Sequence, residues 1–137
     1  MIHTYYIHDK RIILAIYDGA VDTHHIADYE QFIHHSFAQL NSNEKIINLT
    51  DLSYGRIVNS NITQRMAKLT EQYQSLTEMI YISGLSPFTR ILFQSYLRLT
   101  GGHKIHTLSK QPFNELCDSF RVFTPEVYYK LKYKDLA

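Results

Sequence analysis

Two hydrophobic runs near the start of the chain predict a pair of antiparallel strands. The runs Ile2–Ile7 and Arg11–Tyr17 are rich in β-branched and aromatic residues, and only His8-Asp9-Lys10 separates them. A polar link of this length favours a hairpin. Ile12–Ile16 is apolar almost without alternation, which is typical of a strand covered on both faces. We therefore expect the second strand to lie inside the sheet.

Hydrophobic residues at helical spacing follow this hairpin. We expect Asp18-Gly19 to end the second strand, and Asp22 or Thr23 can cap the helix that comes next. The predicted inner face of this first helix consists of Ile26, Tyr29, Ile33, Phe37 and Leu40. The polar residues Asn41-Ser42-Asn43 are expected to stop the helix.

The middle of the chain predicts a short buried strand, a loop and a second helix. The strand covers Lys45–Leu49 and ends near Thr50-Asp51, and the loop continues from there to Asn59. Asn59, Ser60 or Asn61 can cap the second helix. Its predicted apolar face consists of Ile62, Met66, Leu69, Tyr73 and Leu76.

Two further pairs of strand and helix complete the pattern. Met79–Ser83 and Lys104–Leu108 are expected to be strands, and Ser86-Pro87 has the capping residue and the proline that open a third helix. The inner face of that helix is predicted to be Phe88, Ile91, Leu92, Tyr96 and Leu99, with Gly101-Gly102 as its stop. The last helix covers Ser109–Phe120 and is expected to place Phe113, Leu116 and Cys117 inward.

The resulting order, β-β-α-β-α-β-α-β-α, predicts an α/β fold. Strands that alternate with helices pair in parallel through right-handed crossovers, so only the opening hairpin is antiparallel. We expect a mixed, mostly parallel sheet of about five strands flanked by helices. This arrangement accounts for one domain over residues 1–120.

Residues 121–137 are predicted to form an appendage with a short docking helix. Thr124 and Pro125 have the residue types of a helix start. Its apolar residues are Val127, Tyr128 and Leu131, and Lys130, Lys132 and Lys134 are expected to face solvent. A helix this short needs a surface on which to dock. That surface lies on its own domain or on a second copy, which leaves a homodimer open.

Composition excludes several classes of protein. The chain has 137 residues, of which 45% are hydrophobic, and a net charge of +1, so it can form a core and has no global charge that would call for nucleic acid. Cys117 is the single cysteine, which fits a reducing compartment. The start of the chain lacks the pattern of a signal peptide, and no apolar run approaches the length of a membrane span. We expect a cytoplasmic protein.

The histidines raise the question of a metal site. His24-His25 and His34-His35 both fall on the first predicted helix. His24 and His35 share a face of that helix, but a rise of 1.5 Å per residue separates them by about 16 Å, which is farther than one ion can bridge. Solvated histidines without a metal are therefore the expectation.

Asp51 is a candidate for a phosphorylated aspartate. It follows a buried strand, where receiver domains carry a phosphorylated aspartate, but of the supporting groups the chain offers Asp18 alone, and Lys104 stands at the start of a strand. A loop or capping role is expected instead. Glycine-rich phosphate loops and nucleophile turns are missing from the sequence, and Cys117 is predicted to be buried and inert. We expect no cofactor and no catalysis.

Several stretches resemble the STAS domain of anti-sigma factor antagonists and of the cytoplasmic parts of sulfate transporters. Lys45–Ser53 is similar to the family's apolar strand followed by Asp-Leu-Ser. Asn59-Ser60-Asn61-Ile62 stands where the family has Asp-Ser-Ser-Gly before its second helix. Ile82-Ser83-Gly84-Leu85, and the later Gly101-Gly102 with its following strand, match the second half.

The resemblance implies a non-catalytic, cytoplasmic interaction domain that docks a protein partner and is controlled by serine phosphorylation. Ser60 is the implied phosphosite, and Tyr54, Asn59, Ser60 and Asn61 form the implied partner surface. Capping of the second helix is the alternative role for Ser60. Two other functions stay open: a carrier of a small apolar ligand or lipid, held between helices and sheet, and an enzyme with a dispersed site. A sizeable enclosed cavity would favour the carrier.

Overall fold

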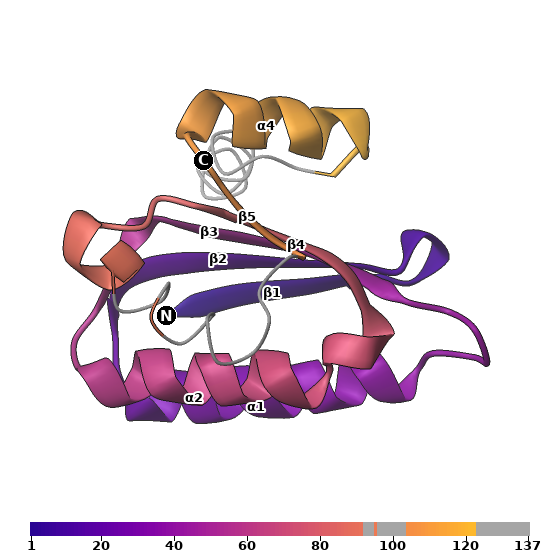
Figure 1. Cartoon of the computed structure of the whole chain (residues 1–137), viewed down its shortest axis with the longest axis horizontal. Helices are drawn as coiled ribbons and strands as arrows, with labels where there is room; N and C mark the ends of the chain where they lie inside the picture. The colour runs from indigo at the N-terminus through magenta and orange to yellow at the C-terminus, as the bar shows by residue number, and fades with distance from the viewer. Residues whose placement is uncertain (92–94, 96–103, 123–137) are drawn as a thin grey trace, which may run out of the picture.

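The computed structural model describes residues 1–91, 95 and 104–122, and its core is a five-stranded sheet in the order β1-β2-β3-β4-β5 (Figure 1). The strands are β1 (Ile2–Ile7), β2 (Ile12–Val21), β3 (Ile46–Ile57), β4 (Thr77–Ser83) and β5 (Ile105–Leu108). The helices are α1 (Thr23–Ala38), α2 (Ser60–Gln72) and α4 (Lys110–Ser119), with the short 3-10 helices η1 (His8–Lys10) and η2 (Gln74–Leu76).

The sheet is mixed, as predicted. β1 pairs antiparallel with β2, and each following pair of neighbours is parallel. All four apolar runs expected in one sheet lie in it, from Ile12–Ile16 in β2 to Ile105–Leu108 in β5. The predicted α/β class is therefore confirmed.

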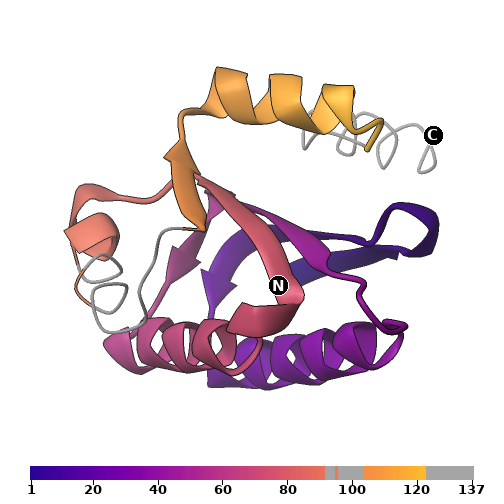
Figure 2. The ribbon, with the colours of Figure 1, turned by 45° about the vertical axis from the view of Figure 1, so that its right-hand side comes forward.

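Helices cover both faces of the sheet. Figures 1 and 2 show α1 and α2 side by side on one face and α4 on the other. β2 explains why both faces need a cover, because its side chains alternate between two hydrophobic clusters. Ile13, Ala15 and Tyr17 belong to the cluster on the α1–α2 side, whereas Ile12, Leu14 and Ile16 belong to the cluster on the α4 side. All six are almost fully buried, so the predicted interior strand is confirmed.

α1 begins at the predicted cap. The carboxylate of Asp22 accepts hydrogen bonds from the backbone N–H groups of His24 (2.9 Å) and His25 (3.1 Å), and Nδ1 of His25 accepts from the backbone N–H of Asp22 (3.2 Å). The hydrogen bond from His25 is the main reason that the pKa of Asp22 is lowered. Of the predicted inner residues, Leu40 lies beyond the end of the helix.

Two strands run farther than predicted. β2 continues through Asp18-Gly19 to Val21, and β3 continues through the expected loop to Ile57. The two strands keep pairing after a bulge, with Gly19 opposite Gly55. A Cβ atom at Gly55 would lie 2.6 Å from Cβ of Tyr17, so glycine allows the close approach. The sequence prediction was wrong here, because Asp18-Gly19 was expected to end β2 and the residues up to Asn59 were expected to form a loop.

The segment after β4 begins as predicted but does not bury the expected side chains. Oγ of Ser86 accepts a hydrogen bond from the backbone N–H of Thr89 (3.2 Å), and residues 87–91 are helical. Phe88 and Ile91, however, are 71% and 67% exposed, because this turn lies past the ends of the strands, away from either face of the sheet (Figure 1). The other predicted contacts, Leu92, Tyr96, Leu99 and Gly101-Gly102, fall outside the described residues.

α4 confirms the last predicted helix. Phe113 and Cys117 are fully buried, and Leu116 is half-buried against the same cluster. Val122 also belongs to that cluster, so core packing extends past Phe120. The rest of the predicted appendage, with its inner residues Val127, Tyr128 and Leu131, lies outside the described residues.

Candidate functional site

The candidate partner surface lies where β3 passes into α2. We call residues 54–61 the β3–α2 junction. Tyr54, Val58, Asn59, Ser60 and Asn61 are all exposed, and Val58 leaves 47% of its surface uncovered. The junction is part strand and part helix start, and not the loop predicted from the sequence, because β3 ends only at Ile57 and α2 begins at Ser60.

Asn59, one of the three predicted candidates, caps α2. Its side-chain oxygen accepts a hydrogen bond from the backbone N–H of Ile62 (3.3 Å), and its backbone is extended. Ser60 is the first helical residue, so the capping role considered for Ser60 is wrong. The first turn of α2 contains no acidic residue. The helix therefore presents an exposed hydroxyl at an end where backbone amides and the helix dipole favour negative charge.

This geometry makes the stability effects of two neighbouring alanine variants unequal. Asn59→Ala removes the cap and is expected to lower the free energy of unfolding by about 1 kcal/mol. Ser60→Ala removes an exposed hydroxyl that caps nothing and is expected to change it by less than about 0.5 kcal/mol. Urea denaturation of both variants measures the difference. A larger loss for Ser60→Ala than for Asn59→Ala would contradict the assignment of the cap.

Asp51 is a buried strand residue, so the expected loop or capping role is wrong. It is fully buried in β3, and its carboxylate is 2.6 Å from Nζ of Lys110, the first residue of α4. Its other oxygen accepts from the backbone N–H of Ser53 (2.8 Å). Nζ of Lys110 also lies 4.4 Å from the centre of the Tyr54 ring, a distance at which a cation is attracted to an aromatic face. This ion pair connects α4 to the start of the junction.

A hollow of about 230 Å³ lies beside the junction. β3 contributes Leu52, Gly55, Arg56 and Ile57 to its wall, and the segment after β4 contributes Gly84, Leu85, Ser86, Phe88 and Thr89. Pockets for small ligands usually measure about 300–1,000 Å³. The hollow is therefore of a size to accept a side chain of a partner more readily than a whole cofactor.

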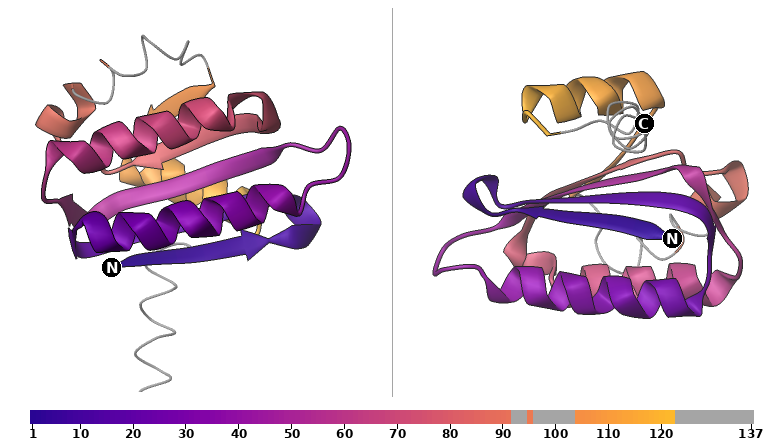
Figure 3. Two further views of the ribbon diagram at one scale, coloured as in Figure 1. Left: turned by 90° about the horizontal axis from the view of Figure 1, so that it is seen from below. Right: turned by 180° about the vertical axis from the view of Figure 1, so that it is seen from behind.

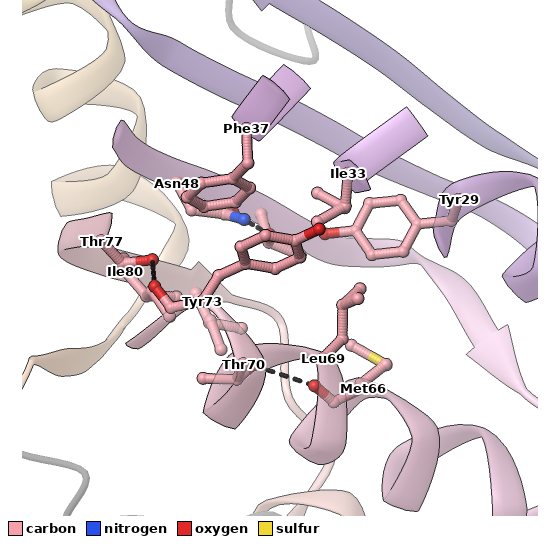
Figure 4. A pocket seen from close by; sticks show the side chains of 12 residues that line it. Tyr29, Ile33, Phe37, Asn48, Met66, Leu69, Thr70, Tyr73, Thr77 and Ile80 are labelled. Atoms are coloured by element: carbon pink, nitrogen blue, oxygen red, sulfur yellow. Dashed lines mark hydrogen bonds between the residues drawn. The ribbon is translucent and has the colours of Figure 1, made fainter. Parts of the chain in front are cut away.

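A second hollow lies between helices α1 and α2 and the sheet (Figure 4). This is where a carrier would hold its apolar ligand. The volume of the hollow is about 50 Å³, enough for a few water molecules and far below that of a lipid pocket. Tyr29 from α1 and Tyr73 from the end of α2 enter it from opposite sides, and the Tyr73 ring stacks on Phe37 at 4.1 Å. Burial raises the pKa of the Tyr29 hydroxyl. The observed cavity does not favour the carrier.

The histidines of α1 have separate local partners. His25 takes part in the helix cap, and Nδ1 of His34 forms a short hydrogen bond with the Tyr73 hydroxyl. Within residues 1–91 and 104–122, no three histidine, cysteine, aspartate or glutamate side chains are grouped so that they could hold a metal ion. Cys117 is a buried free thiol.

No helix in the described part of the chain has both the length and the apolar character needed to cross a membrane.

Comparison with known proteins gives matches in structure only. No protein-family model and no curated protein sequence matches the chain. A solved structure of the anti-sigma factor antagonist SpoIIAA in its unphosphorylated form matches with a TM-score of 0.63 and 11% identity, covering 90% of this chain and 100% of that one. An uncharacterized protein of the DUF3478 family from Shewanella loihica PV-4, described as having a SpoIIAA-like fold, matches with a TM-score of 0.57 and 12% identity. That match covers 79% of this chain and 84% of the other. The chain thus has a STAS-like fold, as the resemblance of its sequence implied.

Proposed function

We propose that the chain is a non-catalytic regulatory domain of the cytoplasm that binds a protein partner through the β3–α2 junction. The fold it shares with an anti-sigma factor antagonist supports a regulatory role. Its buried free thiol fits a reducing compartment. The exposed side chains of Tyr54 and Val58 and the adjacent hollow offer apolar area that a partner could cover.

The observation that carries the proposal is the position of Ser60. Its hydroxyl is exposed at the first residue of α2, two residues after the exposed Val58. A phosphate there would be held by the free amides of the helix end and would add nearly two negative charges to the junction. A partner that packs against Val58 would then face a solvated, doubly charged group. Phosphorylation of Ser60 would therefore weaken the complex without unfolding the domain.

The test compares the proteins retained by immobilised wild type, Ser60→Asp and Ser60→Ala from cells that produce the chain. Wild type and Ser60→Ala are expected to retain the same partner, and Ser60→Asp is expected to lose it. Because an acidic residue in the first turn stabilises a helix, the loss would not come from unfolding, and melting curves of the three proteins check this point.

Ser42→Asp is the matched control. Ser42 is also exposed, and it precedes the start of β3, whereas the junction lies at the other end of that strand. It gains the same charge and is expected to retain the partner. Equal retention by Ser60→Asp and wild type, or equal loss by Ser42→Asp, would contradict the proposal.

A further inference from the structure

Two arginines near the β3–α2 junction have no carboxylate partner among the described residues. Arg65 of α2, by comparison, pairs with Glu30 of α1. Arg56 and Arg90 form no ion pair within residues 1–91, 95 and 104–122. Both arginines are exposed. Their positive charges are therefore not neutralised within the described part of the chain.

The two segments that contain these arginines have no acidic residue. Residues 52–63 and 84–91 include neither aspartate nor glutamate. The acidic residues of β2, of β3 and of the α1 cap have partners of their own. These pairs are Asp18 with His3, Asp22 with the backbone of α1, and Asp51 with Lys110. The two segments therefore carry a net positive charge.

The hollow beside the junction combines this charge with apolar walls. Its volume is about 230 Å³, and Arg56 is the one charged residue among the described residues that line it. The apolar residues of the wall are Leu52, Ile57, Leu85 and Phe88. Figure 3 (left) shows the helical turn of residues 87–91 at the end of the molecule where β3 ends and α2 begins. The hollow thus offers a cation and apolar contacts at one place.

We propose that the partner of the junction binds through an acidic and apolar segment, with a carboxylate at Arg56 and an apolar side chain in the hollow. This inference rests on the proposed function and adds the chemistry of its partner. A guanidinium binds a carboxylate through two parallel hydrogen bonds, which fixes the orientation of the pair. An exposed ion pair alone contributes little free energy, so the apolar side chain in the hollow supplies most of the affinity.

The size and charge of the surface favour a protein segment over other anionic partners. Surfaces that bind anionic lipids usually carry clusters of about four to eight basic residues, and the two segments have two arginines. The hollow is smaller than the roughly 300 Å³ of a small-molecule pocket. Val58, which is 47% exposed, extends the apolar area beyond the hollow. An apolar centre with charges around it is typical of protein interfaces.

The charge of the partner would also explain how phosphorylation of Ser60 weakens the complex. Ser60 follows Arg56 by four residues. A phosphate on Ser60 has the same sign of charge as the carboxylates of the partner. Like charges that face each other across an interface lower the affinity. An acidic partner is therefore the kind that this modification would repel.

An NMR titration of the ¹⁵N-labelled chain tests this chemistry without the partner. The probes are a synthetic peptide of Asp-Ser-Leu repeats and the same peptide with asparagine in place of aspartate. The acidic peptide is expected to shift the backbone amide signals of Gly55, Arg56 and Thr89 and to bind at least fivefold more tightly than the neutral peptide. Raising the salt from 0.1 to 1 M shortens the screening length from about 10 to 3 Å and is expected to remove that preference. Equal affinities for the two peptides, or no binding of the acidic one, would overturn the inference.

Variants of Arg56 assign the preference to this side chain. Arg56→Gln is expected to bind both peptides equally. Arg56→Lys is expected to keep part of the preference, because lysine has the charge but not the planar guanidinium. Lys45→Gln is the matched control, since Lys45 is exposed and precedes β3, at the other end of the strand from Arg56. A preference for the acidic peptide that persists in Arg56→Gln would contradict the assignment.

Titration of the retained partner separates this inference from the proposed function. Arg56→Glu is expected to weaken binding of the partner at least tenfold, and Lys45→Glu is expected to leave it unchanged. If the partner binds Arg56→Glu as tightly as wild type but does not bind Ser60→Asp, the inference is wrong and the proposed function stands. If the peptide preference depends on Arg56 but Ser60→Asp retains the partner, the proposed control by Ser60 is wrong and the acidic preference of the junction stands.

Discussion

Replacing Lys110 with methionine is expected to lower the free energy of unfolding by about 3 kcal/mol, because it leaves the carboxylate of Asp51 buried without a countercharge. Asp51 has no exposed surface, whereas the Lys110 side chain is 30% exposed. The carboxylate cannot turn to water when its partner is lost, but the ammonium group can. Urea denaturation of the purified variant measures the loss.

The same asymmetry supplies the control. Asp51→Asn keeps an acceptor for the N–H of Ser53 and leaves Lys110 free to reach solvent, so its expected cost is about 1 kcal/mol. The double variant Asp51→Asn with Lys110→Met is expected to be more stable than Lys110→Met alone, since no buried charge remains. The account of the ion pair would be wrong if Lys110→Met cost no more than Asp51→Asn.

Replacing Gly84 with alanine is expected to destabilise the domain by about 3–5 kcal/mol, from two sources. The backbone of Gly84 has a φ of +82°, which is unfavourable for alanine, and an added Cβ would lie 2.3 Å from the backbone nitrogen of Ser53. Because the contacted atom belongs to the backbone of β3, it cannot move aside as a flexible side chain would. Thermal or urea unfolding measures the change.

Gly19→Ala separates the cost of the positive φ from the cost of the steric overlap with Ser53. Gly19 has a similar φ of +68°, but an added Cβ would have nothing within 4 Å. Its cost is expected to be that of the backbone conformation alone, about 1 kcal/mol. Similar losses for Gly84→Ala and Gly19→Ala would show that Gly84, the residue after β4, does not approach Ser53 of β3 as described.

The sequence was sufficient for the order of the elements because β2, β3 and β4 are marked by runs of apolar residues and the helices by spacing and caps. The prediction from the sequence was wrong where the same residue pattern is compatible with two different structures. Gly55 reads as part of a loop, but in the structure it is the residue that lets β3 continue beside Tyr17. Phe88 and Ile91 have helical spacing, but the pattern cannot show that the helix lies past the sheet.

Some structural features of the candidate site could be predicted from the sequence. The exposure of Ser60 and the capping by Asn59 follow from short-range rules that a sequence contains. The partner of Asp51 does not follow from such rules. Lys110 is 59 residues away along the chain, and only the tertiary fold brings the two residues together. The position of Lys110, two residues after the last strand, was a usable signal, since the carboxyl ends of parallel strands lie at the same end of a sheet. Lys104, by contrast, precedes that strand and lies at its other end.

The ion pair also gives the junction a rigid start. Lys110 holds Asp51 inside β3 and contacts the ring of Tyr54 at the first position of the junction. Val58 and Ser60 follow on a strand end and a helix start, and not on a free loop. The partner that we propose would therefore bind residues of a strand end and a helix start, which lowers the entropic cost of association.

The affinity of the retained partner for Ser60→Asp tests the central claim most directly. Titration of that protein against wild type, Ser60→Ala, Ser60→Asp and Ser42→Asp gives four dissociation constants under one set of conditions. The account predicts equal affinities for three of them and at least a tenfold weaker one for Ser60→Asp, or about 1.4 kcal/mol. Equal affinities for wild type and Ser60→Asp would contradict it.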